Sequence, residues 1–230
     1  MNIGTKILLS LVIVSLSALV VPLEGHSENS KTESVAVQTA VRIAENVDKN
    51  SIEEQLMPIN FEISNVIEEM NHKMAEIEVI TDKREWFLAY KKIIEKYSYI
   101  IDSPETIYDY FSKEELDLLF HVVQAEVGDE YSFESKINVA NVIFNRFYHE
   151  RFPDTLSEVL VSNQFSTIAN GRYKKVEVSE DTILACEYSY MFSNYNIGNA
   201  VYFQSIGYQN YFCNAEYVYY DGCHYFYEIK

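Results

Sequence analysis

The clearest alternation of apolar and polar positions covers "FSKEELDLLFHVVQAEVGDE", residues 111–130. Ser112 is followed three residues later by Glu115, the pattern of a capping box, so we predict that a helix begins there. Apolar residues then recur at spacings of three and four and form one stripe: Leu116, Leu119 and Val123. The next position on that stripe is Glu126, and Gly128 ends the helix. The pattern therefore predicts a carboxyl on the core face of a helix, close to its C-terminal end.

A second helix is predicted from residues 132 to 148 by the same periodicity. Its inward stripe is apolar: Phe133, Ile137, Ala140, Phe144 and Phe147. The other side carries polar residues at the same spacing: Glu134, Asn138, Asn141 and Asn145. Asparagine is a poor helix former, so this side is either a solvated face or one that points into a wet cleft. Two further helices are predicted, after the caps Thr155 and Ser179.

The last third of the chain changes to a β-like pattern that is rich in aromatic residues. Eleven of the 19 tyrosines lie from Tyr188 onward, in runs such as "AVYFQ" and "YVYYDGCHYFY". Asp221-Gly222 lies between two aromatic runs and predicts a hairpin with a type I′ turn, whose two central residues both need positive φ. Helices followed by a small antiparallel sheet indicate the α+β class.

The N-terminal half differs from this dense region. An uncharged apolar run follows Lys6 and ends at Pro22; it is short for a membrane span and typical of a secretory signal, with an uncleaved anchor as the alternative. The predicted division is a signal peptide at 1–27, a loosely ordered linker at 28–58, a helical preface at 59–111 and a catalytic domain at 112–230. The preface has an apolar stripe from Phe87 to Ile101, which must dock on the following domain or on a partner. No stable membrane insertion is expected once the signal is cleaved.

Composition narrows the classes of partner. The net charge of −17 leaves no basic patch, which argues against nucleic acid as a partner. Three cysteines are too few for a disulfide scaffold in 230 residues; Cys213 and Cys223 could pair across neighbouring strands and leave Cys186 buried. Cys223 and His224 are neighbours, expected to point to opposite faces of a strand, and so form a poor nucleophilic pair. The spacing of Cys and His matches no metal site, so neither a metal nor a cofactor is expected.

Glu126 has two features of a catalytic acid. A carboxyl on an apolar stripe loses solvation, which favours its protonated form, and the carbonyls at a helix C-terminus act in the same direction. An acid that keeps its proton near neutral pH can donate it to a leaving group. The alternative is a core glutamate that is satisfied by an arginine or a backbone amide. The residue pattern alone leaves both open.

Five ordered blocks follow from Ser112 to the end of the chain. They are Ala125-Glu126 with Glu130, Asn145-Arg146, Phe152-Pro153 with Thr155, Gln164-Phe165, and Gly222, His224 and Phe226. Their order and spacing resemble the spore-cortex-lytic cell-wall hydrolase family of the SleB/CwlJ type, whose signature is A-E-x-R-G-E, N-R, F-P-x-T, Q-F and G-x-H-x-F. The chain departs from it at "VGDE", where the arginine is missing and the glycine comes one place early.

The resemblance implies a fold similar to lytic transglycosylases and goose-type lysozymes. It implies cleavage of peptidoglycan glycan strands between N-acetylmuramic acid and N-acetylglucosamine, with Glu126 as the single acid and base. Glu130 is then either a second carboxylate or a structural residue that stabilises the turn or pairs with Arg146. The residues expected to contact the glycan are Gln164, Phe165, Tyr202, Phe203 and His224. The alternative for the aromatic residues among them is that they pack the sheet.

Two other functions remain open at this point. A zinc amidase that cuts the stem peptide would need converging ligands, for which His121, His149 and His224 are the candidates. A wall-binding or spore-structural protein would keep the fold without the activity. In each case the predicted location is outside the cell, in the wall or spore cortex.

Overall fold

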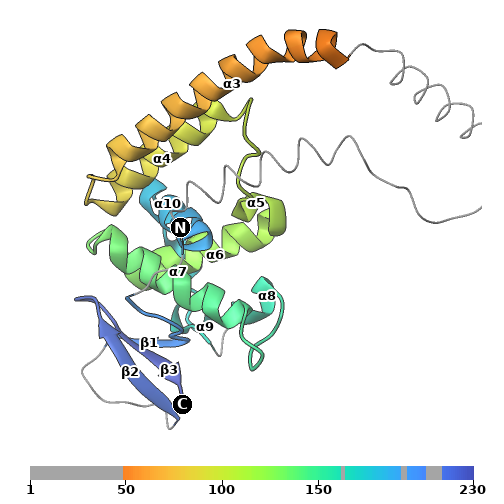
Figure 1. Cartoon of the computed structure of the whole chain (residues 1–230). Coiled ribbons are helices and arrows are strands. Elements are labelled where there is room, and N and C mark those ends of the chain that lie inside the picture. The colour runs from red at the N-terminus through yellow and green to blue at the C-terminus, as the bar shows by residue number, and fades with distance from the viewer. Residues whose placement is uncertain (1–48, 162–163, 193–195, 206–213) are drawn as a thin grey trace, which may run out of the picture. The chain divides into compact units, whose positions relative to one another are not determined.

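The computed structural model describes residues 49–161, 164–192, 196–205 and 214–230 (Figure 1). The predicted signal peptide and most of the predicted linker lie outside these residues. The chain divides into two compact units, one made of residues up to 79 with 92–102, the other of residues 80–91 with 103–230. Among the described residues, no helix combines the length and apolar character needed to cross a membrane.

The first unit contains α3 (Lys49–Ile77) and the last part of α4 (Lys83–Tyr97). The predicted helical preface at 59–111 thus contains two long helices, and α3 begins inside the segment that was expected to be a linker. An ion pair of 2.9 Å joins Lys96 Nζ to Glu69 Oε1, and the Lys96 ammonium also lies 4.9 Å from the centre of the Tyr97 ring.

The second unit is built around three helices, α6 (Lys113–Val127), α7 (Phe133–Phe147) and α10 (Glu180–Met191), which pack on one another. Shorter helices connect them: α5 (Ile107–Tyr110), α8 (Leu156–Val159), α9 (Ser166–Ala169) and the 3₁₀ helix η1 (Arg172–Lys175). The predicted caps Ser112, Thr155 and Ser179 are confirmed, because each side chain accepts a hydrogen bond from the backbone N–H three residues on. Local sequence signals therefore determine where these helices begin.

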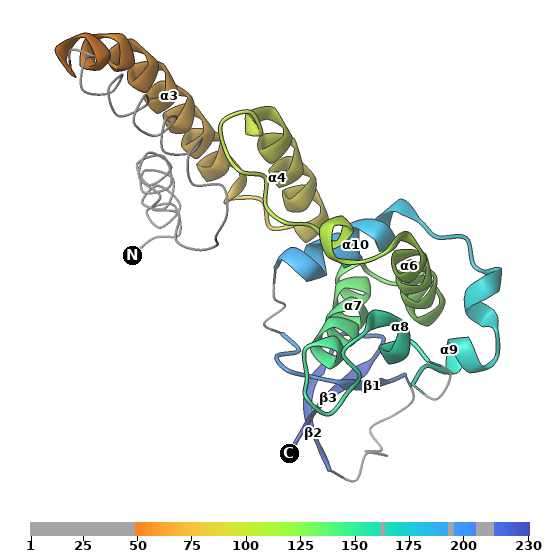
Figure 2. The same ribbon diagram turned by 90° about the vertical axis from the view of Figure 1, so that its right-hand side faces the viewer.

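Three short strands follow: β1 (Tyr202–Gln204), β2 (Ala215–Tyr220) and β3 (Tyr225–Ile229). They form an antiparallel sheet in the order β1-β3-β2, and Figures 1 and 2 place it on the side of α7 away from α10. The predicted α+β class is confirmed. The predicted hairpin is present, but its two-residue turn is wrong: Tyr220 pairs with Tyr225, so residues 221–224 connect the strands.

The asparagine face of α7 is neither solvated nor part of a wet cleft. Asn138 and Asn141 are buried, and Asn138 Nδ2 donates to Asp221 Oδ2 over 3.0 Å. Asn145 Nδ2 donates to two backbone carbonyls, those of Gly198 and Ala200, over 3.0 and 2.9 Å. These amides fasten the C-terminal segment to α7. Buried amides with such partners offset the low helix propensity of asparagine.

The first part of α4 belongs to the second unit. Phe87 is completely buried, and its ring makes edge-on contacts with Tyr188 and Phe192, which lie at and just beyond the end of α10. Ion pairs surround this contact: Lys83–Glu134, Arg84–Asp181 and Lys91–Glu187, at 2.6, 2.6 and 2.5 Å. We call residues 80–91 the strap. The strap covers an apolar part of α10 that the region from residue 112 onward does not cover by itself.

Candidate active site

Glu126 lies in the last turn of α6 and is half-buried. The hydroxyl of Thr167, 41 residues further along the chain, donates to Glu126 Oε1 over 2.6 Å. Thr167 lies in α9 and is 1 % exposed, so this donor is fixed by the packing around it. The acid predicted from the pattern is therefore held by a hydroxyl, whereas the sequence suggested an arginine or a backbone amide.

The helix ends as predicted at Gly128, whose φ of 76° is unfavourable for residues with a side chain. A Cβ at this position would come within 2.3 Å of Glu130 Oε2, so the Glu130 carboxylate folds back over the glycine. Glu130 itself is exposed. Among the described residues no ion pair joins Glu130 to Arg146. The position of Glu130 fits a turn-stabilising role.

Arg146 brings a buried positive charge to the same region. It is 4 % exposed, and its Nε donates to the Val201 carbonyl over 2.6 Å. Its guanidinium lies between aromatic rings, 4.8 Å from the centre of Phe165 and 5.8 Å from that of Tyr202. Burial lowers the pKa of Arg146 to about 10, while the nearby Tyr202 and Glu126 side chains act in the opposite direction. At neutral pH Arg146 therefore carries a positive charge, and this charge interacts electrostatically with Glu126.

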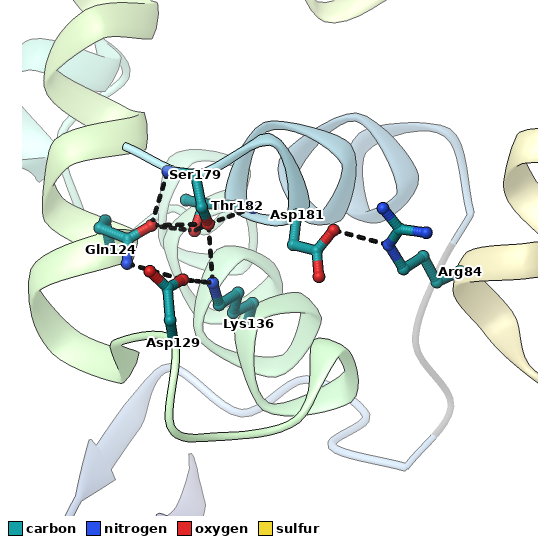
Figure 3. A network of polar contacts seen from close by, with 7 residues as sticks. All are labelled: Arg84, Gln124, Asp129, Lys136, Ser179, Asp181 and Thr182. Atoms are coloured by element: carbon teal, nitrogen blue, oxygen red, sulfur yellow. Dashed lines mark hydrogen bonds and ion pairs between the residues drawn. The ribbon is translucent and has the colours of Figure 1, made fainter. Parts of the chain in front are cut away.

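A network of polar contacts surrounds the turn that follows Glu126 (Figure 3). Gln124 Oε1 accepts from the Ser179 backbone and hydroxyl, each over 3.0 Å, and from the Thr182 hydroxyl over 2.5 Å. Gln124 Nε2 donates to Asp129 Oδ1 over 3.0 Å, and Lys136 Nζ donates to the same oxygen over 2.6 Å. The network therefore joins the end of α6 to the starts of α7 and α10.

One further contact at this helix end had no signal in the sequence. Arg172 of η1 donates from Nη2 to the backbone carbonyl of Ala125, the residue before Glu126. The last carbonyls of a helix lack partners within it, and a cation there is favourable. No local spacing relates residues 125 and 172, so only the folded chain brings them together.

The residues predicted to contact the glycan lie at different depths. Phe165 is 2 % exposed and packs under Arg146 and Phe203, and His224 is also 2 % exposed. Gln164 and the β1 residues Tyr202 and Phe203 are half-buried. Glycan contact thus remains a prediction, and the geometry favours Gln164 and Tyr202 over the two buried side chains.

Cys223 and His224 touch, contrary to the expectation that they point to opposite faces. They precede β3 and lie in the connection after β2, where strand alternation does not apply, and Cys223 Sγ is 3.8 Å from His224 Nε2. Burial raises the pKa of the Cys223 thiol to about 12, and burial lowers the pKa of His224. Both groups are neutral at physiological pH, which does not suit a thiolate nucleophile. Cys223 and Cys186 are free thiols, and Cys213 lies outside the described residues.

The three histidines that a zinc amidase would need lie on separate elements. His121 is on α6, where its Nδ1 bonds the Asp117 carbonyl over 2.8 Å, and His149 follows α7. His224 lies between β2 and β3. In the part of the chain that the structure describes, no group of three or more His, Cys, Asp or Glu side chains could hold a metal ion.

Comparison with known proteins supports the class suggested by the motifs. Residues 130–227 match the model of the family described as Cell Wall Hydrolase. This part of the chain is therefore similar to the cell wall hydrolase family, in agreement with the resemblance drawn from the sequence. The matched region begins four residues after Glu126, so the assignment of Glu126 rests on the A-E motif and on its geometry. No curated protein matches the chain.

Two solved structures are similar to the chain. One is the catalytic domain of the germination-specific lytic transglycosylase SleB from Bacillus anthracis, with 21 % identity and a TM-score of 0.47, covering 53 % of this chain and 100 % of that one. The other is the catalytic domain of the Bacillus cereus SleB protein, with 21 % identity and a TM-score of 0.45, covering 51 % of this chain and 92 % of that one.

Proposed function

We propose that the chain is an exported peptidoglycan-degrading enzyme that cleaves the glycan strand between N-acetylmuramic acid and N-acetylglucosamine as a lytic transglycosylase. The observation that carries the proposal is the half-buried Glu126 carboxyl at the end of α6, held by the Thr167 hydroxyl. The family match over residues 130–227 supports the choice of the cell wall as substrate.

The chemistry needs one carboxyl in two protonation states. Protonated Glu126 gives its proton to the glycosidic oxygen, and the bond from that oxygen to C1 of the muramic acid breaks. The 6-hydroxyl of the same sugar forms a new bond to C1 and returns its proton to Glu126. The products are a 1,6-anhydromuramic end and an N-acetylglucosamine with a free 4-hydroxyl. Ordinary glycoside hydrolysis normally uses two carboxyl groups, whereas here one serves as acid and then as base.

Two neighbours support the ionised state that Glu126 adopts between these steps. The Thr167 hydroxyl donates a hydrogen bond to the carboxylate, and hydrogen bonds to a charged group are stronger than those to a neutral one. The buried Arg146 guanidinium supplies a fixed positive charge nearby. Charges and donors placed before the reaction stabilise charge as it develops, without reorganisation of solvent.

The test is mass spectrometry of purified peptidoglycan digested by the full chain and by its Glu126→Gln variant. The amide oxygen that this substitution introduces can still accept from Thr167, so the change removes the transferable proton and leaves the contact. We expect turnover to fall by about 10²–10⁴-fold, the usual contribution of general acid catalysis, with the melting temperature unchanged or slightly raised. Glu130→Gln is the matched control, because that carboxylate is exposed and lies on the turn; it should retain turnover.

Each competing function gives a distinct product pattern. Anhydro-ended glycans identify transglycosylation, and reducing ends carrying one more water identify hydrolysis. Free stem peptides, lost with EDTA and restored with zinc, would establish the amidase instead. Bound but undegraded peptidoglycan would establish a wall-binding protein. Full turnover of the Glu126→Gln variant would remove Glu126 from the mechanism.

Export is part of the same proposal, since peptidoglycan lies outside the cytoplasmic membrane. It rests on the apolar run between Lys6 and Pro22. N-terminal sequencing of protein recovered from the wall or spore cortex should find a new terminus near residue 27. Recovery of the full-length chain from the cytoplasm alone would contradict export.

A further inference from the structure

The buried Lys136 and its ion pair with the exposed Asp129 have no role in the proton transfers proposed for Glu126. Lys136 is 2 % exposed, although lysine is among the residues least often buried. Its ammonium group lies 2.6 Å from Asp129 Oδ1 and 3.0 Å from the Ser179 hydroxyl (Figure 3). A buried charge is costly unless it is paired and hydrogen-bonded, so the partner is specified by the structure.

Asp129 is one of the two residues, with Gly128, at which the motif departs from the family signature. It occupies the third position of "VGDE", directly after the positive-φ Gly128. Its Oδ1 accepts from Lys136 of α7 and from Gln124 of α6, and these bonds, the one from Lys136 foremost, lower its pKa to about 2. Asp129 is therefore ionised throughout the physiological range and joins two helices through one oxygen.

The hydrogen bond between the Gln124 and Asp129 side chains spans the segment of chain that contains Glu126. Gln124 lies two residues before Glu126 and Asp129 three residues after it, so this side-chain bridge closes a loop of chain that contains Glu126 and Gly128. Gln124 is in turn held by three donors from Ser179 and Thr182 at the start of α10. The backbone that carries Glu126 is thus attached on both sides to other elements.

We infer that Asp129, held by Lys136, is a positioning residue that fixes the Glu126 carboxyl for proton transfer. The inference rests on the proposed function and adds to it a residue that does not touch the carboxyl. None of the hydrogen bonds drawn in Figure 3 reaches Glu126, so the network holds the backbone on either side of Glu126 and does not contact its carboxyl. A small displacement of a catalytic group lowers the rate of reaction much more than it lowers substrate binding.

Two substitutions separate positioning from stability. Asp129→Asn removes the charge but keeps an oxygen that can accept from Lys136 and Gln124, whereas Asp129→Ala removes both the charge and the acceptor. Each leaves the buried ammonium without its counter-charge, so both should lower the melting temperature, Asp129→Ala further because it also leaves Lys136 and Gln124 without an acceptor. Both variants should fold, because the Asp129 side chain is 64 % exposed.

The matched control is Asp181→Ala. Asp181 lies in the same view and forms an ion pair of the same length, 2.6 Å, with Arg84, but this pair does not touch the turn (Figure 3). Kinetics on soluble glycan strands should show a kcat for Asp129→Ala lowered roughly 10- to 100-fold with KM little changed. Asp129→Asn should retain most of kcat despite its lower melting temperature, and Asp181→Ala should match the unmodified chain.

Measuring Glu126→Gln in the same assay keeps the two ideas apart. If Glu126→Gln retains turnover, the proposed mechanism fails, whatever the Asp129 variants do. If Glu126→Gln is inactive and Asp129→Ala keeps its kcat, the positioning role alone is refuted. A kcat that follows the melting temperature equally in both Asp129 variants would also refute it, since the residue would then act only on stability.

Discussion

The strap offers a direct test of where the second unit begins. Phe87 of α4 is 0 % exposed and packs edge-on against Tyr188 and Phe192. Truncating a buried phenylalanine to alanine costs about 3–5 kcal/mol, from lost burial and the cavity left behind. For a unit of this size each kcal/mol shifts the melting temperature by about 2–4 °C, so Phe87→Ala should lower it by about 6–20 °C. This is a large part of the stability of an ordinary domain.

The docking of the strap can be followed by the fluorescence of the chain's single tryptophan. This residue is Trp86, which stacks on Tyr90 at 5.4 Å and lies 5.3 Å from Phe192. Tryptophan fluorescence therefore reports the docking of the strap, while far-ultraviolet circular dichroism reports total helix. In urea or on heating, both signals of the unmodified chain should change together if the strap folds with the rest of the second unit.

The matched control is Phe61→Ala. Phe61 lies on α3 and is 68 % exposed, so the same truncation there removes little buried surface and should change the stability by less than about 0.5 kcal/mol. If Phe87→Ala also costs less than about 1 kcal/mol, well below the usual cost of truncating a buried phenylalanine, the strap is not part of the unit. The same conclusion follows if Trp86 loses its environment well before the helices melt. A catalytic domain that begins at residue 112 would then be sufficient.

Two substitutions test the turn and the buried histidine. Gly128→Ala should cost about 1–2 kcal/mol for its positive φ and should displace the Glu130 carboxylate, whereas Gly198→Ala, with φ of 50° and open space around it, should show only the backbone cost in urea denaturation. Burial lowers the pKa of His224, so the unfolded chain takes up its proton first as the pH falls. Stability from this group is full above about pH 6.5 and declines below it. Melting curves should show a smaller loss between about pH 7 and 5 for His224→Asn; an unchanged loss would contradict the assignment.

The helices could be located from the sequence because their signals are local. A capping residue and its partner are three positions apart, as in Ser112 and Glu115, and helix formation itself brings them together. The apolar stripe and the terminal Gly128 are equally short-range patterns. The position of Glu126 at a helix end followed from the same counting. These are the parts of the site that the sequence could predict.

The contacts that support Glu126 could not be found in this way. Thr167 and Arg172 lie more than forty residues further along the chain, and no periodicity relates them to the end of α6. The asparagine face of α7 was misread for the same reason, since its partners Asp221 and Gly198 lie at the far end of the sequence. Tertiary hydrogen bonds depend on which elements meet, and one sequence does not contain that information in any local spacing.

The departure "VGDE" is best explained by the residues that surround it. In the sequence it is a departure from the family signature, because the arginine is missing and the glycine is one place early. In the structure the early Gly128 ends α6 directly after Val127, and Asp129 is then in reach of Lys136 and Gln124. The altered turn is thus fastened to the helices on either side. Under the positioning role that we propose for Asp129, the altered turn is a different way of fixing Glu126, and the kinetics of the Asp129 variants decide between this and a loss of the site.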